Sequence, residues 1–86
     1  MKITKSELEI FRAEIINCLI TFGNLQEAEA IELMDFAKMF EDKSEMAINL
    51  LFHEPPYYWA MVLLHPENSE WHRDEKLWPP PKGYIS

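Results

Sequence analysis

The sequence predicts an all-α protein: a small antiparallel bundle of three to four helices, followed by an extended, proline-rich C-terminal tail. Three observations lead to this fold class. Apolar residues recur at spacings of three and four, the period of one helical face. Helix-capping residues stand in front of these patterns, and consecutive prolines interrupt the second half of the chain. The 86 residues have room for one domain, which we place at 1–77, with the tail at 78–86.

The first predicted helix occupies residues 4–23 and is the best marked. Thr4 is a favourable N-cap, and Glu7 stands at the capping-box position three residues later. Gly23 is a natural C-terminal stop. We expect most of this helix to be buried, because its apolar face is wide and contains Leu8, Phe11, Ile15, Ile16, Cys18, Leu19, Ile20 and Phe22.

A second helix is expected immediately after the first. Asn24 is its expected N-cap and Glu27 completes a second capping box. With so short a connection, the two helices should form an antiparallel hairpin. The predicted core-facing side chains of the second helix are Ala30, Leu33, Phe36, Ala37 and Phe40.

A break is expected at residues 42–44, followed by a shorter helix over 45–52. Ser44 can cap this helix, and Met46, Ala47 and Leu50 supply its apolar side. The alternative is one continuous bent helix over 25–52, because no strong helix breaker lies within that range.

Pro55 and Pro56 end the third helix, because proline lacks a backbone donor and disfavours helix in the preceding residue. Residues 57–64 are apolar on every side, so periodicity does not separate a buried helix from a buried strand. We predict a short helix starting near Pro56, which suits a first-turn position. The alternative is a strand that pairs with a second copy of the chain.

Residues 65–69 indicate a turn, and residues 70–77 could hold one turn of helix. In the tail, three consecutive prolines favour a polyproline II segment.

The net charge of −7 excludes direct binding to nucleic acid, which requires clustered Lys and Arg. Most of this charge lies in residues 24–54, where eight acidic residues face two lysines. These acids either form a solvated helix face or meet a basic partner protein, with Glu27, Glu32 and Asp35 as the candidate contacts. No apolar run approaches the roughly 20 residues of a membrane span, and the N-terminus lacks a signal peptide's apolar centre.

The residues that carry enzyme chemistry are sparse. His53, His65 and His72 lack the spacing of a helical zinc motif, and two glycines are too few for a phosphate-binding loop. Cys18 lies in an apolar helical pattern, where burial keeps a thiol inert. We therefore expect no catalysis, no cofactor and no metal. A single cysteine also fits a reducing, cytoplasmic setting.

Aromatic side chains crowd the last third of the chain. One interpretation is that the tail folds back and these rings complete a small core. The other is that they form an exposed anchor for another protein, since Trp and Tyr dominate interface hot spots. The candidate anchor residues are Tyr57, Tyr58, Trp59, Trp71, Trp78 and Tyr84.

A short acidic helical chain with paired tyrosines, Tyr57 and Tyr58, after its third helix resembles the immunity proteins that neutralise nuclease bacteriocins. The likeness is one of shape and charge and includes no sequence motif. It implies a bacterial inhibitor that occludes the substrate site of a basic toxin without performing a reaction.

The residues themselves lead to two functional hypotheses, besides the alternative of an enzyme with a histidine–carboxylate metal site. The first is a non-catalytic protein-binding module, an inhibitor or escort of a basic partner, in which reversing the charges of Glu32 and Asp35 should slow association. The second is a homo-oligomeric structural or accessory protein, such as a homodimer held by residues 57–64 and the tail.

Overall fold

The computed structural model describes residues 3–41, 44–68, 70–75, 77–78 and 80. Across these residues the chain is all-helical and without strands, which confirms the predicted fold class. A helix rather than a strand follows Pro55, so the strand alternative for residues 57–64 is wrong. None of the described helices has both the length and the apolar character needed to cross a membrane. The elements are α1 (Lys5–Gly23), α2 (Glu27–Ala37), α3 (Glu45–Phe52), α4 (Pro56–Leu64) and the 3-10 turn η1 (Trp71–Arg73).

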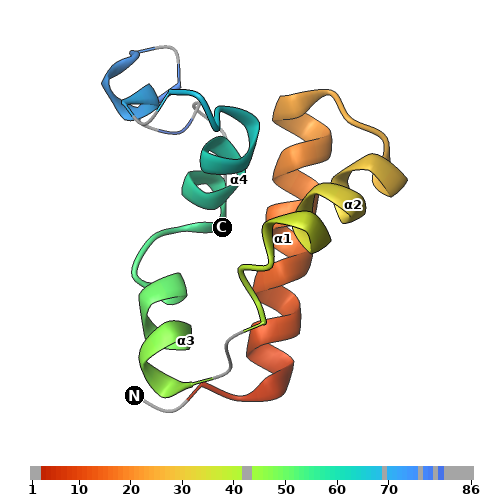
Figure 1. The fold of residues 1–86 in the computed structure, drawn as a ribbon, viewed down its shortest axis with the longest axis vertical. Helices are drawn as coiled ribbons and strands as arrows, with labels where there is room; N and C mark the ends of the chain where they lie inside the picture. The colour runs from red at the N-terminus through yellow and green to blue at the C-terminus, as the bar shows by residue number, and fades with distance from the viewer. Residues whose placement is uncertain (1–2, 42–43, 69, 76, 79, 81–86) are drawn as a thin grey trace.

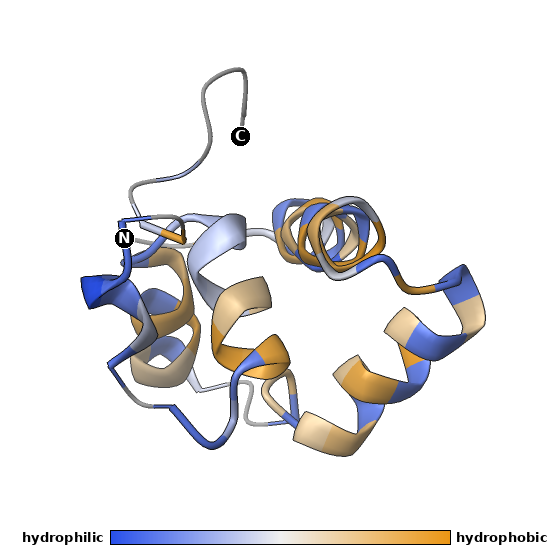
Figure 2. Ribbon diagram, turned by 90° about the horizontal axis from the view of Figure 1, so that it is seen from above, coloured by the Kyte–Doolittle hydropathy of each residue, from blue (hydrophilic) through white to orange (hydrophobic). Residues whose placement is uncertain are grey.

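The long helix α1 organises the bundle (Figure 1). Its most extensive contact is with α4, which lies beside its C-terminal half, while α2 turns back and crosses α1 obliquely. Helix α3 lies beside the N-terminal half of α1 (Figure 1). Figure 2 shows apolar and pale colours all around α4, whereas polar and apolar residues alternate along α2. The largest fully buried side chains are Ile15, Leu19, Tyr57 and Met61, so the core lies between α1 and α4.

The predicted start of α1 is confirmed, but the expected N-cap of α2 is wrong. Thr4 and Glu7 form the reciprocal capping box, with Glu7 N–H donating to Thr4 Oγ1 at 3.1 Å. Asn24 instead ends α1 in the left-handed conformation, with φ of 57°. Asparagine tolerates that conformation better than most residues. Because Asn24 is used there, α2 begins later, and Glu29 accepts from the backbone N–H of its N-cap Gln26 at 3.0 Å.

Helix α2 ends at Ala37, because Lys38 adopts the left-handed conformation with φ of 56°. The continuous helix over 25–52 is therefore wrong. The expected core face of α2 is also wrong in part, since Ala30 and Met34 are buried while Phe36 and Ala37 are exposed. The oblique crossing explains this, because only a short stretch of α2 meets α1.

Ser44 caps α3 as predicted, accepting from the backbone N–H of Ala47 at 3.3 Å. The expected apolar side of α3 is wrong, because Met46 and Leu50 point outward. Leu51 enters the core instead, and the Phe52 ring stacks on Phe11 with centroids 4.3 Å apart. Helix α3 thus contacts the core through Leu51 and Phe52 at its C-terminal end, and Met46 and Leu50 lie on the side of α3 that faces away from the core.

The turn of helix expected within residues 70–77 is present as η1. Of the predicted polyproline segment, only Trp78 and Pro80 belong to the described residues. The remainder of the tail, with Tyr84, lies outside them.

Candidate functional site

The three acidic residues predicted to meet a partner all lie on α2 and are exposed. Asp35 differs from Glu27 and Glu32, because it accepts a hydrogen bond from Arg12 Nη2 of α1 at 3.1 Å. Both members of this ion pair are partly exposed, so the pair contributes little to stability. It nevertheless offsets the charge of Asp35, which leaves Glu27 and Glu32 as the stronger contributors to the local negative potential.

Tyr57 belongs to the core. Its side chain is 1% exposed, and its hydroxyl donates to the backbone carbonyl of Leu77 at 2.7 Å. Burial raises the pKa of the Tyr57 phenol above its ordinary value of 10.0, and the charge of Cys18 raises it further. Tyr57 therefore ties α4 to the segment after η1 and has no surface of its own to offer a partner.

Trp71 is also a core residue, at 2% exposed, and it holds the chain after α4 against the bundle. Its ring lies 5.2 Å from Tyr58 and 5.7 Å from Trp78, centroid to centroid. Trp78 is half-buried and stacks on Tyr57 at 6.3 Å. Among the described aromatic residues, the interpretation that these rings complete a small core fits Tyr57 and Trp71.

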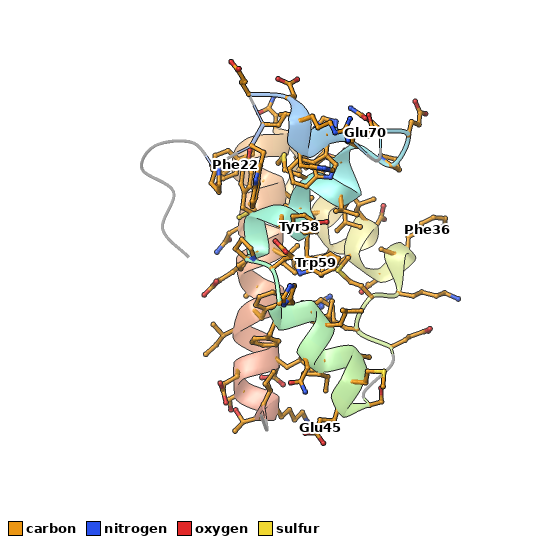
Figure 3. All side chains as sticks on the ribbon, turned by 90° about the vertical axis from the view of Figure 1, so that its left-hand side faces the viewer. Phe22, Phe36, Glu45, Tyr58, Trp59 and Glu70 are labelled. Atoms are coloured by element: carbon orange, nitrogen blue, oxygen red, sulfur yellow. The ribbon has the colours of Figure 1, made fainter. Side chains whose placement is uncertain are left out.

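Tyr58, Trp59 and Trp78 are half-buried and keep some surface. The Trp59 indole Nε1–H donates to the backbone carbonyl of Leu51 at 2.7 Å, which links α4 to α3. The rings of Tyr58 and Trp59 pack edge to face at 5.2 Å. In Figure 3 both side chains lie near the middle of the view, on α4 close to where it follows α3. Among the anchor candidates that the structure describes, these three residues therefore keep surface that a partner could contact.

The most exposed aromatic residue in the described chain is Phe36, which the sequence placed in the core. Its side chain is 85% exposed, and Figure 3 shows it at the outer edge of the molecule. Helical periodicity could not reveal this exposure, because Phe36 has the spacing of a core residue relative to Leu33 and Phe40. The early end of α2 and its oblique crossing of α1 leave Phe36 outside.

Phe36 stands at the rim of an apolar groove between α2 and α4. The groove has a volume of about 560 Å³, and residues of the turn that follows α4 contribute to its lining. Its lining residues come from α2, from α4 and from the segment up to η1, and they are Leu33, Phe36, Ala37, Tyr58, Val62, Leu63, His65, Pro66, Asn68 and Trp71. The groove thus places Tyr58 and Trp71 near α2, a proximity that the sequence does not reveal.

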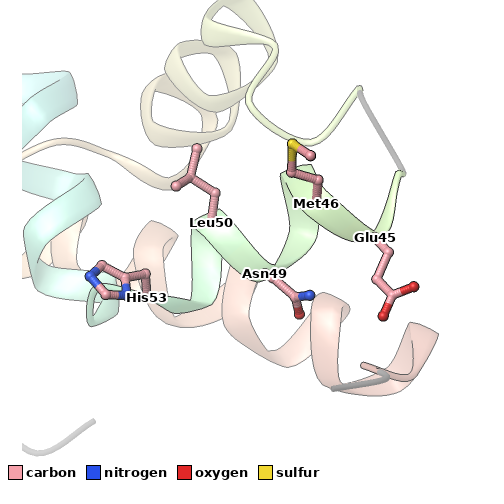
Figure 4. Close-up of a pocket in the computed structure, with 5 residues that line it drawn as sticks. All are labelled: Glu45, Met46, Asn49, Leu50 and His53. Carbon is pink, nitrogen blue, oxygen red and sulfur yellow. The ribbon is translucent and has the colours of Figure 1, made fainter.

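A second exposed apolar surface lies on α3. Met46 is 82% exposed and Leu50 is 66% exposed, and both lie in a shallow hollow of about 610 Å³. Figure 4 shows Met46 and Leu50 projecting from one side of α3, with Glu45 and Asn49 on the other side and His53 at the end of the helix.

The described residues offer no evident centre for chemistry. Across them, no group of three or more His, Cys, Asp or Glu side chains could hold a metal ion. Cys18 is buried in the core beside α4. Three surface features of the described residues could meet another molecule: an acidic outer side of α2, an apolar groove and an apolar side of α3.

Comparison with known proteins adds no name to these surfaces. No protein-family model matches the sequence, and neither a curated protein nor a solved structure gives a significant match. The function of this chain must therefore be argued from its own side chains.

Proposed function

We propose that this chain is a non-catalytic protein-binding module, an acidic inhibitor or escort that covers the working surface of a basic partner protein. The observation that carries the proposal is the outer side of α2, where exposed carboxylates flank the exposed ring of Phe36. Protein-binding surfaces typically combine an aromatic side chain, which becomes buried in the partner, with exposed charged residues around it that complement the charges of the partner.

The charge distribution supports a basic partner. The whole chain carries −7, and α2 alone holds four exposed acids, Glu27, Glu29, Glu32 and Asp35. A surface of one sign speeds the encounter with a partner of the opposite sign and excludes partners of like charge. In this proposal Glu27 and Glu32 steer the approach, and Phe36, Tyr58, Trp59 and Trp78 supply contact area.

The proposed action is occlusion. By covering a cationic surface, the chain would prevent that surface from binding its own anionic substrate, and no covalent step is involved. This is the mode implied by the resemblance to immunity proteins of nuclease bacteriocins, and a reducing, cytoplasmic setting would suit Cys18.

The first experiment is affinity capture of the tagged protein from its source cells, followed by mass spectrometry. We expect one stoichiometric, basic protein to accompany the wild type and to be lost when Glu32 is changed to Lys. The matched control is Glu9→Lys, which makes the same change of charge on the exposed side of α1, opposite Phe11. Recovery of no basic partner, or equal recovery with Glu32→Lys, would contradict the proposal.

The kinetics of the purified pair test the steering. Glu32→Lys should lower the association rate by about threefold to tenfold at low salt and flatten its dependence on ionic strength. Glu32 is preferred to Asp35 for this variant, because changing Asp35 would also break the ion pair with Arg12. Unchanged association rates in Glu32→Lys would show that the acids of α2 are only a solvated face.

The exposed side of α3 favours a second candidate, a homo-oligomeric structural or accessory protein. Met46 and Leu50 are large apolar side chains with little cover, and self-association would bury them. Sedimentation equilibrium should then show a dimer that Leu50→Ser dissociates. A monomer at concentrations up to about 1 mM would exclude this function, since that corresponds to a binding free energy weaker than about −4 kcal/mol.

A further inference from the structure

The groove between α2 and α4 has helical walls. Helices α2 and α4 both pack on α1. They contact each other less than either of them contacts α1, so a space remains between them. Leu33 of α2 and Val62 of α4 line the space between them, and Phe36 stands at its rim.

Carboxylates accompany both sides of this groove. On α2, Glu29 and Glu32 are exposed and share a side of the helix with Leu33 and Phe36, because residues three, four and seven apart are neighbours. Past α4, Glu67 and Glu70 are exposed and alternate in sequence with lining residues.

Among the described residues, few positive charges lie beside these carboxylates. Arg73 pairs with Glu70 at 3.6 Å, and Lys38 follows the end of α2. An occupant would therefore meet an apolar centre with a negative excess on each flank.

We propose that this groove binds an amphipathic α-helix of the basic partner, with aliphatic side chains seated between α2 and α4 and Lys or Arg on both flanks. The proposal rests on the proposed function and names the kind of segment that the partner presents. A helix laid into a groove between two helices recurs in peptide recognition, with anchors at helical spacing.

The walls of the groove favour a helix over an extended segment. The backbone groups of α2 and α4 are used within those helices, so an extended peptide would find no strand edge to pair with, whereas a helix satisfies its own backbone groups. Charge disfavours a second copy of this chain as the occupant, because each copy carries −7 and would bring like charge to the rims.

The test uses a synthetic helix of about 18 residues, five turns long, with Leu on one face and Lys on the others. Its binding is followed by NMR on isotope-labelled protein and by calorimetry. We expect chemical-shift changes at the methyl groups of Leu33 and Val62, and an affinity that falls about tenfold or more in Phe36→Ser, from the transfer free energy of a phenyl side chain. The matched control Leu50→Ser removes an exposed apolar side chain on α3 and should bind like the wild type.

Peptide controls separate the alternatives. A peptide with Ala in place of Leu should lose the groove shifts, and one with a central proline should bind about tenfold or more weakly, because proline breaks the helix. Equal binding of the Ala peptide would mean that charge alone attracts the helix, and equal binding of the proline peptide would mean an extended occupant. Either result overturns the proposal, as does the absence of groove shifts with about 1 mM peptide.

The proposal and the proposed function fail in different ways. If the captured basic protein binds Phe36→Ser as tightly as the wild type but is lost in Glu32→Lys, the groove is not its site: the present inference falls, and the inhibitor or escort function remains without Phe36 as an anchor. If the Leu/Lys helix binds in the groove but no basic protein is captured, the proposed function falls and the groove remains a helix-binding site. Groove shifts that appear on concentrating the protein alone would assign the groove to a second copy and overturn the inference.

Discussion

Lys38 and Asn24 are the non-glycine residues of the described chain that adopt a positive φ, and each of them ends a helix. The left-handed conformation brings the Cβ atom close to the following carbonyl oxygen, a strain that Asn tolerates better than Lys. Tyr57, by contrast, is buried, and its hydroxyl donates a hydrogen bond to the carbonyl of Leu77. These positions are where single substitutions test the structure most directly.

Lys38→Gly should stabilise the protein. Glycine adopts φ of 56° without a Cβ clash, and this gain exceeds its greater backbone entropy in the unfolded chain, so we expect an increase of about 0.5–1 kcal/mol in the free energy of unfolding. Lys38→Ala removes the same charge and keeps the Cβ, so it should give no increase. Chemical denaturation of the three proteins measures this, and equal gains in both variants would assign the effect to charge.

Tyr57→Phe should destabilise the protein by about 1 kcal/mol, because the half-buried carbonyl of Leu77 loses its hydroxyl donor while the ring remains. Tyr58→Phe is the matched control, since no described residue hydrogen bonds to the Tyr58 hydroxyl. The free energy of unfolding, measured by urea denaturation, should be lower for Tyr57→Phe than for Tyr58→Phe. A cost in Tyr58→Phe equal to that in Tyr57→Phe would contradict this role of Tyr57.

The raised pKa of Tyr57 also predicts a pH dependence. The folded state holds the phenolic proton of Tyr57 more tightly than the unfolded state. The contribution of this group to the free energy of unfolding is therefore fully present below pH 10, and it is lost as the pH rises through the folded pKa. Tyr57→Phe should remove this part of the alkaline loss. An unchanged alkaline slope in the variant would show that Tyr57 does not titrate differently on folding.

Among the helices, the closest packing joins the end of α1 to the end of α4. A Cβ added at Gly23 would lie 2.6 Å from Cδ2 of Leu64 and 3.0 Å from Cδ1, which is too close for atoms in contact. Gly23 therefore does more than end α1, because its lack of a side chain lets α4 approach. This close approach is part of the contact of α1 with α4, the most extensive in the bundle.

Gly23→Ala should destabilise the protein by about 1 kcal/mol, because displacement of Leu64 outweighs the better helix propensity of alanine. In a Leu64→Ala background the same change should be neutral or stabilising. The double-mutant cycle, measured by thermal or chemical unfolding, gives the coupling of the two sites. Additive effects would mean that Leu64 moves aside freely and that Gly23 is needed only as a helix end.

For the molecule as a whole, the main electrostatic feature is a charge of −7 within extents of 33 × 26 × 26 Å. The Debye length is about 30 Å at 0.01 M salt and about 8 Å at 0.15 M. At low salt every carboxylate therefore acts on every other across the molecule, and at moderate salt only near neighbours interact. The folded state, being compact, carries more of this repulsion than the unfolded chain.

Raising NaCl from about 0.01 M to 0.15 M should raise the midpoint of thermal unfolding by a few degrees, roughly what 0.5 kcal/mol produces in a domain of this size. Combining Glu9→Lys with Glu32→Lys adds two charges at each site, which brings the net charge from −7 to −3 and should reduce the rise. A midpoint that is constant or falls with salt would show that attractive ion pairs outweigh the repulsion.

Local sequence patterns were enough to predict the all-α class, the capping box at Thr4 and Glu7 and the cap at Ser44, and they favoured a helix near Pro56 without excluding a strand. These follow from local chemistry: side-chain oxygens that accept from the first helical N–H groups, and a proline that fits a first turn. The acids of α2 were likewise identified from the distribution of charge along the sequence, and they are exposed.

The sequence did not predict which apolar side chains are buried, because that depends on how the helices pack against one another. Phe36, Met46 and Leu50 have the spacing of core residues, yet they are exposed, while Met34 and Leu51 are buried. A period of 3.6 shows that a helix has an apolar side, but the angle at which the helix crosses its neighbour selects the few residues that make contact. The groove between α2 and α4 could not be predicted from the sequence either, because the residues that line it lie far apart in the chain and meet only when the helices pack.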